Sequence, residues 1–180
     1  MKRLYAPWRS AYTKSVHSSK DDSAKKVDCV FCQQITAHKD EEYFILGRFK
    51  HTFALLNLYP YNAGHILLLP YTHTAELFAL THDERTELIE LASITQLILK
   101  KALVAQGFNV GLNQGKAAGA GIPSHVHMHI LPRWIGDTNF LPLLADTKQI
   151  STNLGELYQQ LLPFFKEVTF QHIKEKIDEK

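Results

Sequence analysis

The sequence predicts an α+β domain in which an antiparallel sheet of about five strands is covered by one long helix and one shorter helix. Three observations support this fold class. Two strand-like runs at 42–46 and 52–56 are joined by a short connection, which favours an antiparallel pair. Apolar residues recur at helical spacing from a capping box at Thr81 until Gly107, and a period-two alternation over 125–131 indicates a further strand.

Length and composition indicate one domain over residues 1–180. The chain has a mass of 20.5 kDa, is 45% hydrophobic and 21% charged, and carries a formal net charge of +2. This charge is too small to indicate nucleic-acid binding. No apolar run reaches the roughly 20 residues of a membrane helix, and the N-terminus lacks the apolar core of a secretion signal. We therefore expect a cytoplasmic protein that binds neither nucleic acid nor membrane.

The two ends of the chain differ from the middle. Residues 1–28 combine an aromatic segment with a polar stretch, which predicts an irregular arm followed by a mobile loop. Residues 166–180 are expected to form a charged tail. A second helix is expected to start at Thr152-Asn153 and to be interrupted at Pro163.

Cys29 and Cys32 are the only cysteines, and their Cys-x-x-Cys spacing has three interpretations. The pair is half of a zinc site, a redox pair, or two small buried residues that stay reduced. A redox pair belongs in a thioredoxin-like βαβ unit, which the sequence does not indicate. A structural zinc would need two further ligands.

The run 66–69 is entirely apolar and predicts a strand in the middle of the sheet. His65 opens this strand, where it is either a satisfied core histidine or a group that supports a site. His73 follows the strand, where it fits a surface loop. Asn57, at the exit of the preceding strand, fits a turn before Pro60.

A strand expected over 108–113 leads into a glycine-rich loop, 114–123, directly before the histidine-rich stretch. Its glycines would let backbone N–H groups approach phosphate, although a flexible connection would look the same. Four residues here are candidates for phosphate or ribose contact: Asn113 above all, then Gln114, Gly121 and Ser124.

His125, His127 and His129 alternate with apolar residues, so a strand would place all three imidazoles on one face. Neighbouring rings would lie roughly 6–7 Å apart, and the row would span about 13 Å, the scale of a short run of phosphates. Pro132 is expected to end the strand. Imidazole acts as nucleophile, acid, base, donor or metal ligand near pH 7. The alternatives are a polar strand face and a zinc site built from these histidines.

The segment His125-Val-His-Met-His-Ile-Leu resembles the signature of the histidine triad family, His-φ-His-φ-His-φ-φ with φ apolar. The resemblance extends over most of the chain, through 6–9, 29–32, 57–65 and 132–140, and is closest to the branch that cleaves diadenosine polyphosphates. It implies a homodimer. It also implies that Asn57 binds ribose, and that Cys29, Cys32, His73 and His125 hold a structural zinc.

The resemblance further implies that His127 attacks the α-phosphorus of a dinucleoside polyphosphate, such as diadenosine tetraphosphate. Phosphate or water would then resolve the nucleotidyl-His127 intermediate. His125 and His129 would donate to phosphate oxygens, and His65 would support the site. The ring of His125 cannot fully serve both as donor and as zinc ligand.

No metal is required for this catalysis, although magnesium could accompany the substrate phosphates. Three other functions are consistent with the sequence. They are hydrolysis of nucleoside phosphoramidates or adenylyl conjugates, a zinc hydrolase with the triad as ligands, and a nucleotide-binding regulator without turnover.

Overall fold

The computed structural model describes residues 29–145, 150 and 153–168, so the arm expected over 1–28 and the tail beyond 168 lie outside the described residues. Its strands are β1 (Ile45–Arg48), β2 (Thr52–Leu56), β3 (Ile66–Pro70), β4 (Gly107–Leu112) and β5 (Met128–Arg133). Its helices are α2 (Val30–Thr36), α3 (His82–Leu103), α4 (Leu141–Leu144) and α5 (Leu154–Lys166), with 3-10 turns η2 (Leu77–Ala79) and η3 (Lys116–Ala118). The described strands form one antiparallel sheet in the order β1-β2-β3-β5-β4, which confirms the expected fold class.

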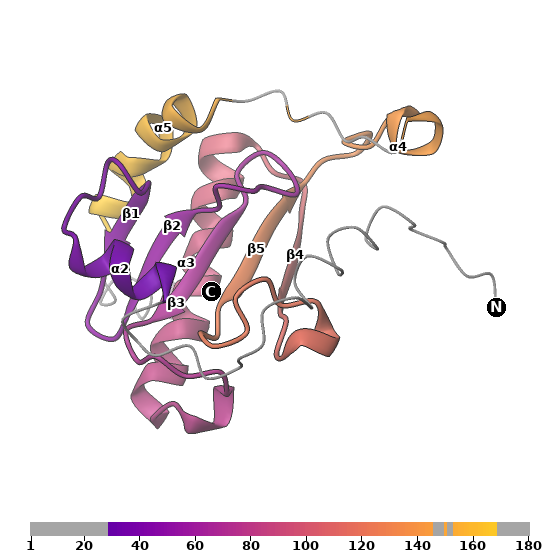
Figure 1. Ribbon diagram of the computed structural model, residues 1–180. Helices are drawn as coiled ribbons and strands as arrows, with labels where there is room; N and C mark the ends of the chain where they lie inside the picture. Colours follow the sequence, from indigo (N-terminus) through magenta and orange to yellow (C-terminus); the bar gives the residue numbers. More distant parts are fainter. Residues whose placement is uncertain (1–28, 146–149, 151–152, 169–180) are drawn as a thin grey trace, which may run out of the picture.

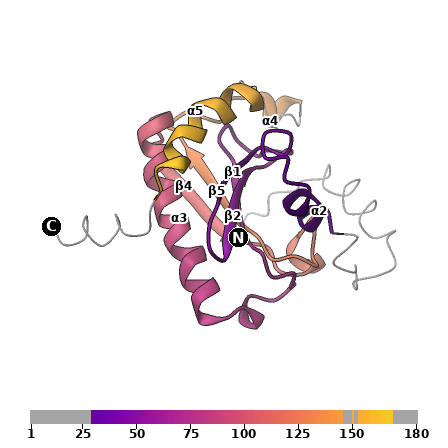
Figure 2. The ribbon, with the colours of Figure 1, turned by 90° about the vertical axis from the view of Figure 1, so that its left-hand side faces the viewer.

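The two faces of the sheet are covered by different helices (Figures 1 and 2). Helices α3 and α5 pack on one face, and α2 lies on the other. The α3 face holds the larger apolar core, to which Leu68 and Ile130 of the sheet and Leu88 and Leu99 of α3 contribute. None of the described helices is long and apolar enough to cross a membrane.

Strand β3 is the central strand, as its uninterrupted apolar run predicted, and all its residues are buried. Its neighbour β5 alternates: Met128 and Ile130 belong to the α3-side core, so His129 between them faces the α2 side. In the register, His129 is opposite Leu67 of β3 and Gly111 of β4. The sheet therefore presents His129 near its middle.

The histidine-rich strand differs from the prediction at both ends. It begins only at Met128, so His125 and His127 lie in the segment before it. It also continues through Pro132, which pairs with Phe108 of β4. The nitrogen and the carbonyl of a strand residue point to the same side, and the Pro132 carbonyl faces the loop before β3, where Asn62 donates to it at 3.0 Å. Strand β3 pairs with β5 only as far as Ile130, so the N–H that proline lacks would have had no partner in β3.

Helix α3 begins as predicted. Thr81 is the N-cap, and Thr81 and Glu84 form both bonds of the capping box. The helix ends before the predicted Gly107, because Val104 adopts a left-handed conformation with φ of 53° and Gly107 instead starts β4. The Trp134 indole N–H donates to the last carbonyls, those of Leu103 and Val104, which stabilises this early end.

Two further helices differ from the prediction. Helix α2, which follows Cys29, was not predicted. Helix α5 starts at the expected place, with Asn153 accepting from the N–H groups of Gly155 and Glu156, but it continues through Pro163 to Lys166. Pro163 is exposed, so the carbonyl that loses its helical donor can be hydrated, and the buried Phe165 holds the last turn against the core.

The turn before β3 requires a glycine. Gly64 has φ of 74°, and a Cβ there would lie 2.7 Å from Leu103 Cδ1 and 3.1 Å from Pro132 Cγ. This close approach brings the chain against α3 and β5 and fixes where the next residue, His65, enters the sheet.

Candidate active site

His127 is held with one particular ring nitrogen available. Its ring is buried, and Nδ1 lies 2.8 Å from the backbone carbonyl oxygen of His125. Because a carbonyl only accepts, Nδ1 carries the proton, and the lone pair is on Nε2. Burial lowers the pKa of His127 more than this hydrogen bond raises it. The ring is therefore a neutral imidazole with a nucleophilic Nε2 at neutral pH.

His65 and His129 form a second chain of fixed tautomers. The backbone N–H of Tyr61 donates to Nδ1 of His65 at 3.1 Å, so the proton of His65 is on Nε2. This Nε2 lies 2.9 Å from Nδ1 of His129 and donates to it. His129 consequently carries its proton on Nε2, a buried atom for which the described residues offer no hydrogen-bond partner. A buried N–H group without a partner is suited to donate a hydrogen bond to an anionic oxygen of a substrate.

Both of these rings are uncharged. Burial, assisted by the neighbouring rings of His129 and His127, lowers the pKa of His65 to about 3. Burial, assisted by His127, lowers the pKa of His129 to about 4. The centroids of the His127 and His129 rings are 5.0 Å apart, closer than regular strand spacing because His127 precedes the strand. A nucleophilic lone pair thus lies beside an N–H donor.

Asn57 and Tyr61 surround His65. Asn57 Nδ2 donates to Nδ1 of His65 at 3.2 Å, and its Oδ1 accepts from the backbone N–H of Tyr59, so Asn57 both shapes the turn and holds His65. The half-exposed Tyr61 ring packs on His65 and His129, with centroid distances of 4.8 and 5.8 Å. Tyr61 was missed in the sequence, where an aromatic residue four positions before His65 was the only available signal.

The candidates from the glycine-rich loop lie at the same end of the sheet. Asn113 directly follows Leu112, which pairs with Met128, and it is partly buried, as is Ser124. Gly121 is exposed. Gln114 donates to Glu76 at 3.1 Å and lines an open hollow with three other side chains, Leu77, Phe78 and Arg85. The loop therefore adjoins His127, while Gln114 points toward η2.

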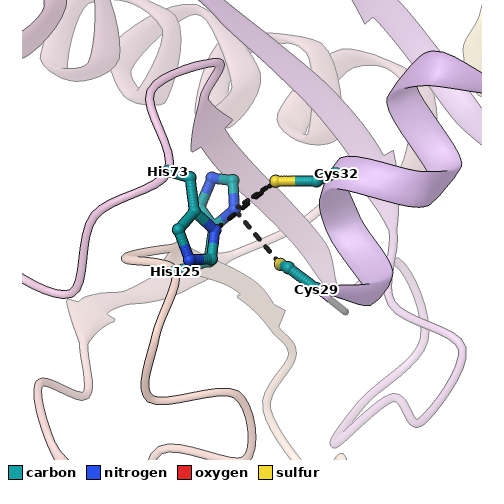
Figure 3. Close-up of side chains that lie close together, drawn as sticks. All are labelled: Cys29, Cys32, His73 and His125. Atoms are coloured by element: carbon teal, nitrogen blue, oxygen red, sulfur yellow. Dashed lines mark hydrogen bonds between the residues drawn. The ribbon is translucent and has the colours of Figure 1, made fainter. Parts of the chain in front are cut away.

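Cys29, Cys32, His73 and His125 form a Cys₂His₂ cluster whose four ligand atoms all lie within 4.8 Å of one another (Figure 3). Nδ1 of His125 is 3.5 Å from Cys29 Sγ and 3.6 Å from Cys32 Sγ, and Nδ1 of His73 is 3.4 Å from Cys32 Sγ. Zinc–ligand bonds at a tetrahedral angle place sulfur and nitrogen about 3.5 Å apart. The cluster therefore fits a tetrahedral zinc ion.

The ring of His125 is engaged at both nitrogens. Nδ1 faces the two sulfurs, and Nε2 lies 2.9 Å from the carbonyl oxygen of Pro70. A ligating histidine ordinarily donates its second N–H to such a group, which fixes its orientation. This geometry favours the metal-ligand role of His125 over that of a phosphate donor.

Arg133, Asp137 and Asn62 form a polar cluster at the exit of β5. The Arg133 guanidinium binds both carboxylate oxygens of Asp137, at 2.6 and 2.8 Å, and Asn62 donates to the same carboxylate. The Arg133 interaction holds the pKa of Asp137 far below its usual range. These residues brace the turn after β5, where Asp137 orients the Arg133 guanidinium.

The HIT-domain family profile matches residues 38–134, which is more than half of the chain and includes all three triad histidines. The chain belongs to the histidine triad (HIT) family. An AP-4-A phosphorylase from Mycobacterium tuberculosis is 36% identical over 150 residues, covering 83% of this chain and 77% of that protein. The asymmetrical bis(5′-nucleosyl)-tetraphosphatase of Schizosaccharomyces pombe is 34% identical over 115 residues, covering 63% of each.

Solved structures agree with this membership. A zinc-bound histidine triad family protein from Mycobacterium smegmatis superposes with a TM-score of 0.65 at 22% identity, covering 79% of this chain and 96% of that one. A hypothetical histidine triad nucleotide-binding protein from Sulfolobus tokodaii gives 0.61 at 28% identity, with 77% and 90% covered. The sheet and helices described above are thus the HIT fold.

Proposed function

We propose that this HIT protein cleaves dinucleoside polyphosphates, with diadenosine tetraphosphate as the foremost candidate, through a covalent nucleotidyl-His127 intermediate. The observation that carries the proposal is the hydrogen bond from His127 Nδ1 to the His125 carbonyl, because it leaves the Nε2 lone pair available at neutral pH. The choice of substrate is supported by the name of the 36% identical relative, an AP-4-A phosphorylase.

The reaction proceeds in two displacements at the α-phosphorus. Nε2 of His127 attacks, an N–P bond forms, and the P–O bond to the leaving polyphosphate breaks. The ring becomes cationic, and the His125 carbonyl stabilises it through the Nδ1 proton. Phosphate or water then attacks the same phosphorus, and the N–P bond breaks to restore neutral imidazole. Phosphate yields ADP and water yields AMP, each together with ATP from the first step.

His129 stabilises the transferring group. Its Nε2–H lacks a described partner, and its ring is adjacent to that of His127, so it donates to a non-bridging phosphate oxygen. His65 acts behind it by donating to His129 Nδ1. Asn57 orients His65. Asn113 and Ser124 are proposed to contact the nucleotide. Magnesium on the substrate phosphates stays a prediction.

The Cys₂His₂ cluster is assigned to a structural zinc, held by Cys29, Cys32, His73 and His125. When bound, zinc would cross-link α2 to the segment between β3 and η2 and to the segment before β5, a contribution to stability rather than to the chemical step. The zinc-bound relative from Mycobacterium smegmatis is consistent with this assignment. The alternative of a triad-ligated zinc is disfavoured because the ring of His129 is already held by His65.

A homodimer is also proposed. Among the described residues β4 pairs with β5 alone, so its outer edge is unpaired, and Val110 on it is 45% exposed. A second copy could extend the sheet there, which size-exclusion chromatography with light scattering would detect.

The decisive experiment is intact-protein mass spectrometry after mixing with diadenosine tetraphosphate, with and without inorganic phosphate. We expect the wild type to gain the mass of one AMP and His127→Ala to gain none. Release of ADP with ATP would show phosphorolysis, and AMP with ATP hydrolysis. Turnover without an adduct, retained by His127→Ala, would contradict the covalent mechanism. Nucleotide binding without products would indicate a regulator, and turnover restricted to phosphoramidates would indicate that alternative substrate class.

A further inference from the structure

His125 belongs to two systems at once. Its ring is one corner of the Cys₂His₂ cluster, with Nδ1 3.5 and 3.6 Å from the two sulfurs. Its main-chain carbonyl, in the same residue, accepts the Nδ1 proton of His127 at 2.8 Å. An interaction that fixes the His125 ring therefore also restrains the His125 carbonyl oxygen, which sets the tautomer of His127.

A second connection runs through α2. Phe31 lies between Cys29 and Cys32 in sequence and is buried. Its ring contacts the His125 ring edge-on, with centroids 5.7 Å apart, and the His127 ring at 5.3 Å. Because both cysteines are at the start of α2, ligation there would fix the position of Phe31 against the nucleophile.

A third connection joins the remaining ligand to the same segment. The carbonyl of Thr74, the residue after His73, accepts from the backbone N–H of Val126 at 2.7 Å. Val126 lies between His125 and His127. Three separate contacts thus link the cluster to residues 125–127, which precede the first residue of β5.

We infer that the Cys₂His₂ cluster, when it holds its metal, is a positioning element for the nucleophile, and that His125 is the positioning residue that transmits this effect. A ring nitrogen's protonation is set by the hydrogen bond its partner nitrogen makes. With the ligands unlinked, His125 turns more freely, its carbonyl leaves the line of His127 Nδ1, and the Nε2 lone pair is present for a smaller fraction of the time. The catalytic part of this inference rests on the proposed function, whereas the tautomer part does not.

The test compares zinc-loaded wild type with Cys32→Ser, which removes one ligand at nearly constant volume. Val30→Ala is the matched control, because it lies in the same helix and its side chain is 41% exposed. Metal content is measured by mass spectrometry, and the His127 tautomer by the ¹⁵N chemical shifts of its ring without any substrate. The rate of AMP-adduct formation and the Kd for AMP are measured separately.

We expect Cys32→Ser to lose its metal, to retain its circular-dichroism spectrum, and to show a mixture of His127 tautomers. Adduct formation should slow by about 10–100-fold, the usual range for losing an outer partner of a site, while the Kd for AMP changes less than about threefold. Val30→Ala should match wild type in all four measurements. The cobalt-loaded wild type should show the visible bands of tetrahedral thiolate coordination and keep the wild-type tautomer.

A metal-free Cys32→Ser protein with the wild-type tautomer and adduct rate would overturn the inference. If Cys32→Ser does not fold, chelator-stripped wild type, with zinc restored in a second sample, replaces it. Loss of the whole circular-dichroism spectrum on stripping would also overturn the inference, since the metal would then hold the entire fold. If wild type forms no adduct, the proposed function fails, while the tautomer comparison still decides the coupling.

Discussion

At the scale of single residues, the site depends on two backbone groups that fix two histidines in opposite roles. The Tyr61 N–H places the His65 proton on Nε2, which makes His129 an Nε2–H donor. The His125 carbonyl places the His127 proton on Nδ1, which makes its Nε2 a lone-pair donor. Burial keeps all three rings neutral, so adjacent imidazoles of the same intrinsic chemistry differ in function only through their partners.

His65→Phe tests this relay. The substitution keeps a ring but removes the donor to His129, so we expect the rate of AMP transfer to His127 to fall by about 10–100-fold in single-turnover kinetics. His82→Phe is the matched control, because His82 is an exposed histidine in the first turn of α3. A rate for His65→Phe within a factor of two of wild type would show that His129 needs no support.

Asn57→Ala tests the outer end of the same chain. Asn57 holds both His65 Nδ1 and the Tyr59 N–H, so its loss should loosen His65 while the Tyr61 N–H still sets its tautomer. We expect a smaller decrease in AMP-transfer rate than for His65→Phe, about threefold to tenfold, with little change in KM. If Asn57 instead binds ribose directly, KM would rise while the transfer rate at saturation stays unchanged.

The spacing of the triad and the Cys-x-x-Cys pair, read with the family resemblance, predicted the four residues that the structure brings together in the cluster. The nucleophilic role of His127, which the same resemblance implied, stays a prediction. The role of His125 depended on which carbonyl its ring would meet, and Pro70 is 55 positions away in the chain. Tyr61 was missed because it contributes a backbone N–H, which every residue type but proline has, and because the contacts of its ring with His65 and His129 depend on the fold.

At the scale of elements, the sequence predicted features that depend on neighbouring residues but not features that depend on contacts distant in the chain. The start of α3 follows from the Thr81–Glu84 capping box, which lies within four consecutive residues. Its end at Leu103 is stabilised by the Trp134 indole, 30 positions from Val104, so the predicted end at Gly107 was wrong. Helix α2 is too short to be stable alone and exists because Phe31 and the cysteines are buried on the sheet.

One side chain attaches α3 to the β1–β2 connection. Oε1 of Glu87 accepts from the backbone N–H groups of His51 and Thr52, at 2.7 and 2.8 Å, and from the Thr52 hydroxyl at 2.8 Å. Glu87→Ala leaves these donors unpaired, so we expect the free energy of unfolding to fall by about 2–3 kcal/mol in urea denaturation. Glu90→Ala, one turn further along, should change it by less than about 0.5 kcal/mol. Equal effects would mean that the three bonds contribute nothing.

At the scale of the whole molecule, the two faces of the sheet respond differently to acid. The α3 face is closed by aliphatic side chains such as Leu88, Leu91 and Leu99. The opposite face contains the buried His65 and the partly buried His129, both in neutral form. Protonation of these two rings in acid therefore destabilises the face that carries the site.

The direction of this effect follows from the pKa values. Unfolding returns His129 from a pKa of about 4 to the ordinary 6.5, so between these values the unfolded chain binds more protons than the folded one. The stability that the neutral ring confers is complete above pH 6.5 and is lost as the pH falls toward 4. We expect wild type to lose about 1–2 kcal/mol more than His129→Phe across this interval in urea denaturation, allowing for partial exposure of the ring. Parallel curves would contradict the low pKa. Because both proteins carry the same Cys₂His₂ cluster, loss of metal in acid lowers both curves alike. The difference then reports His129 and its effect on His65.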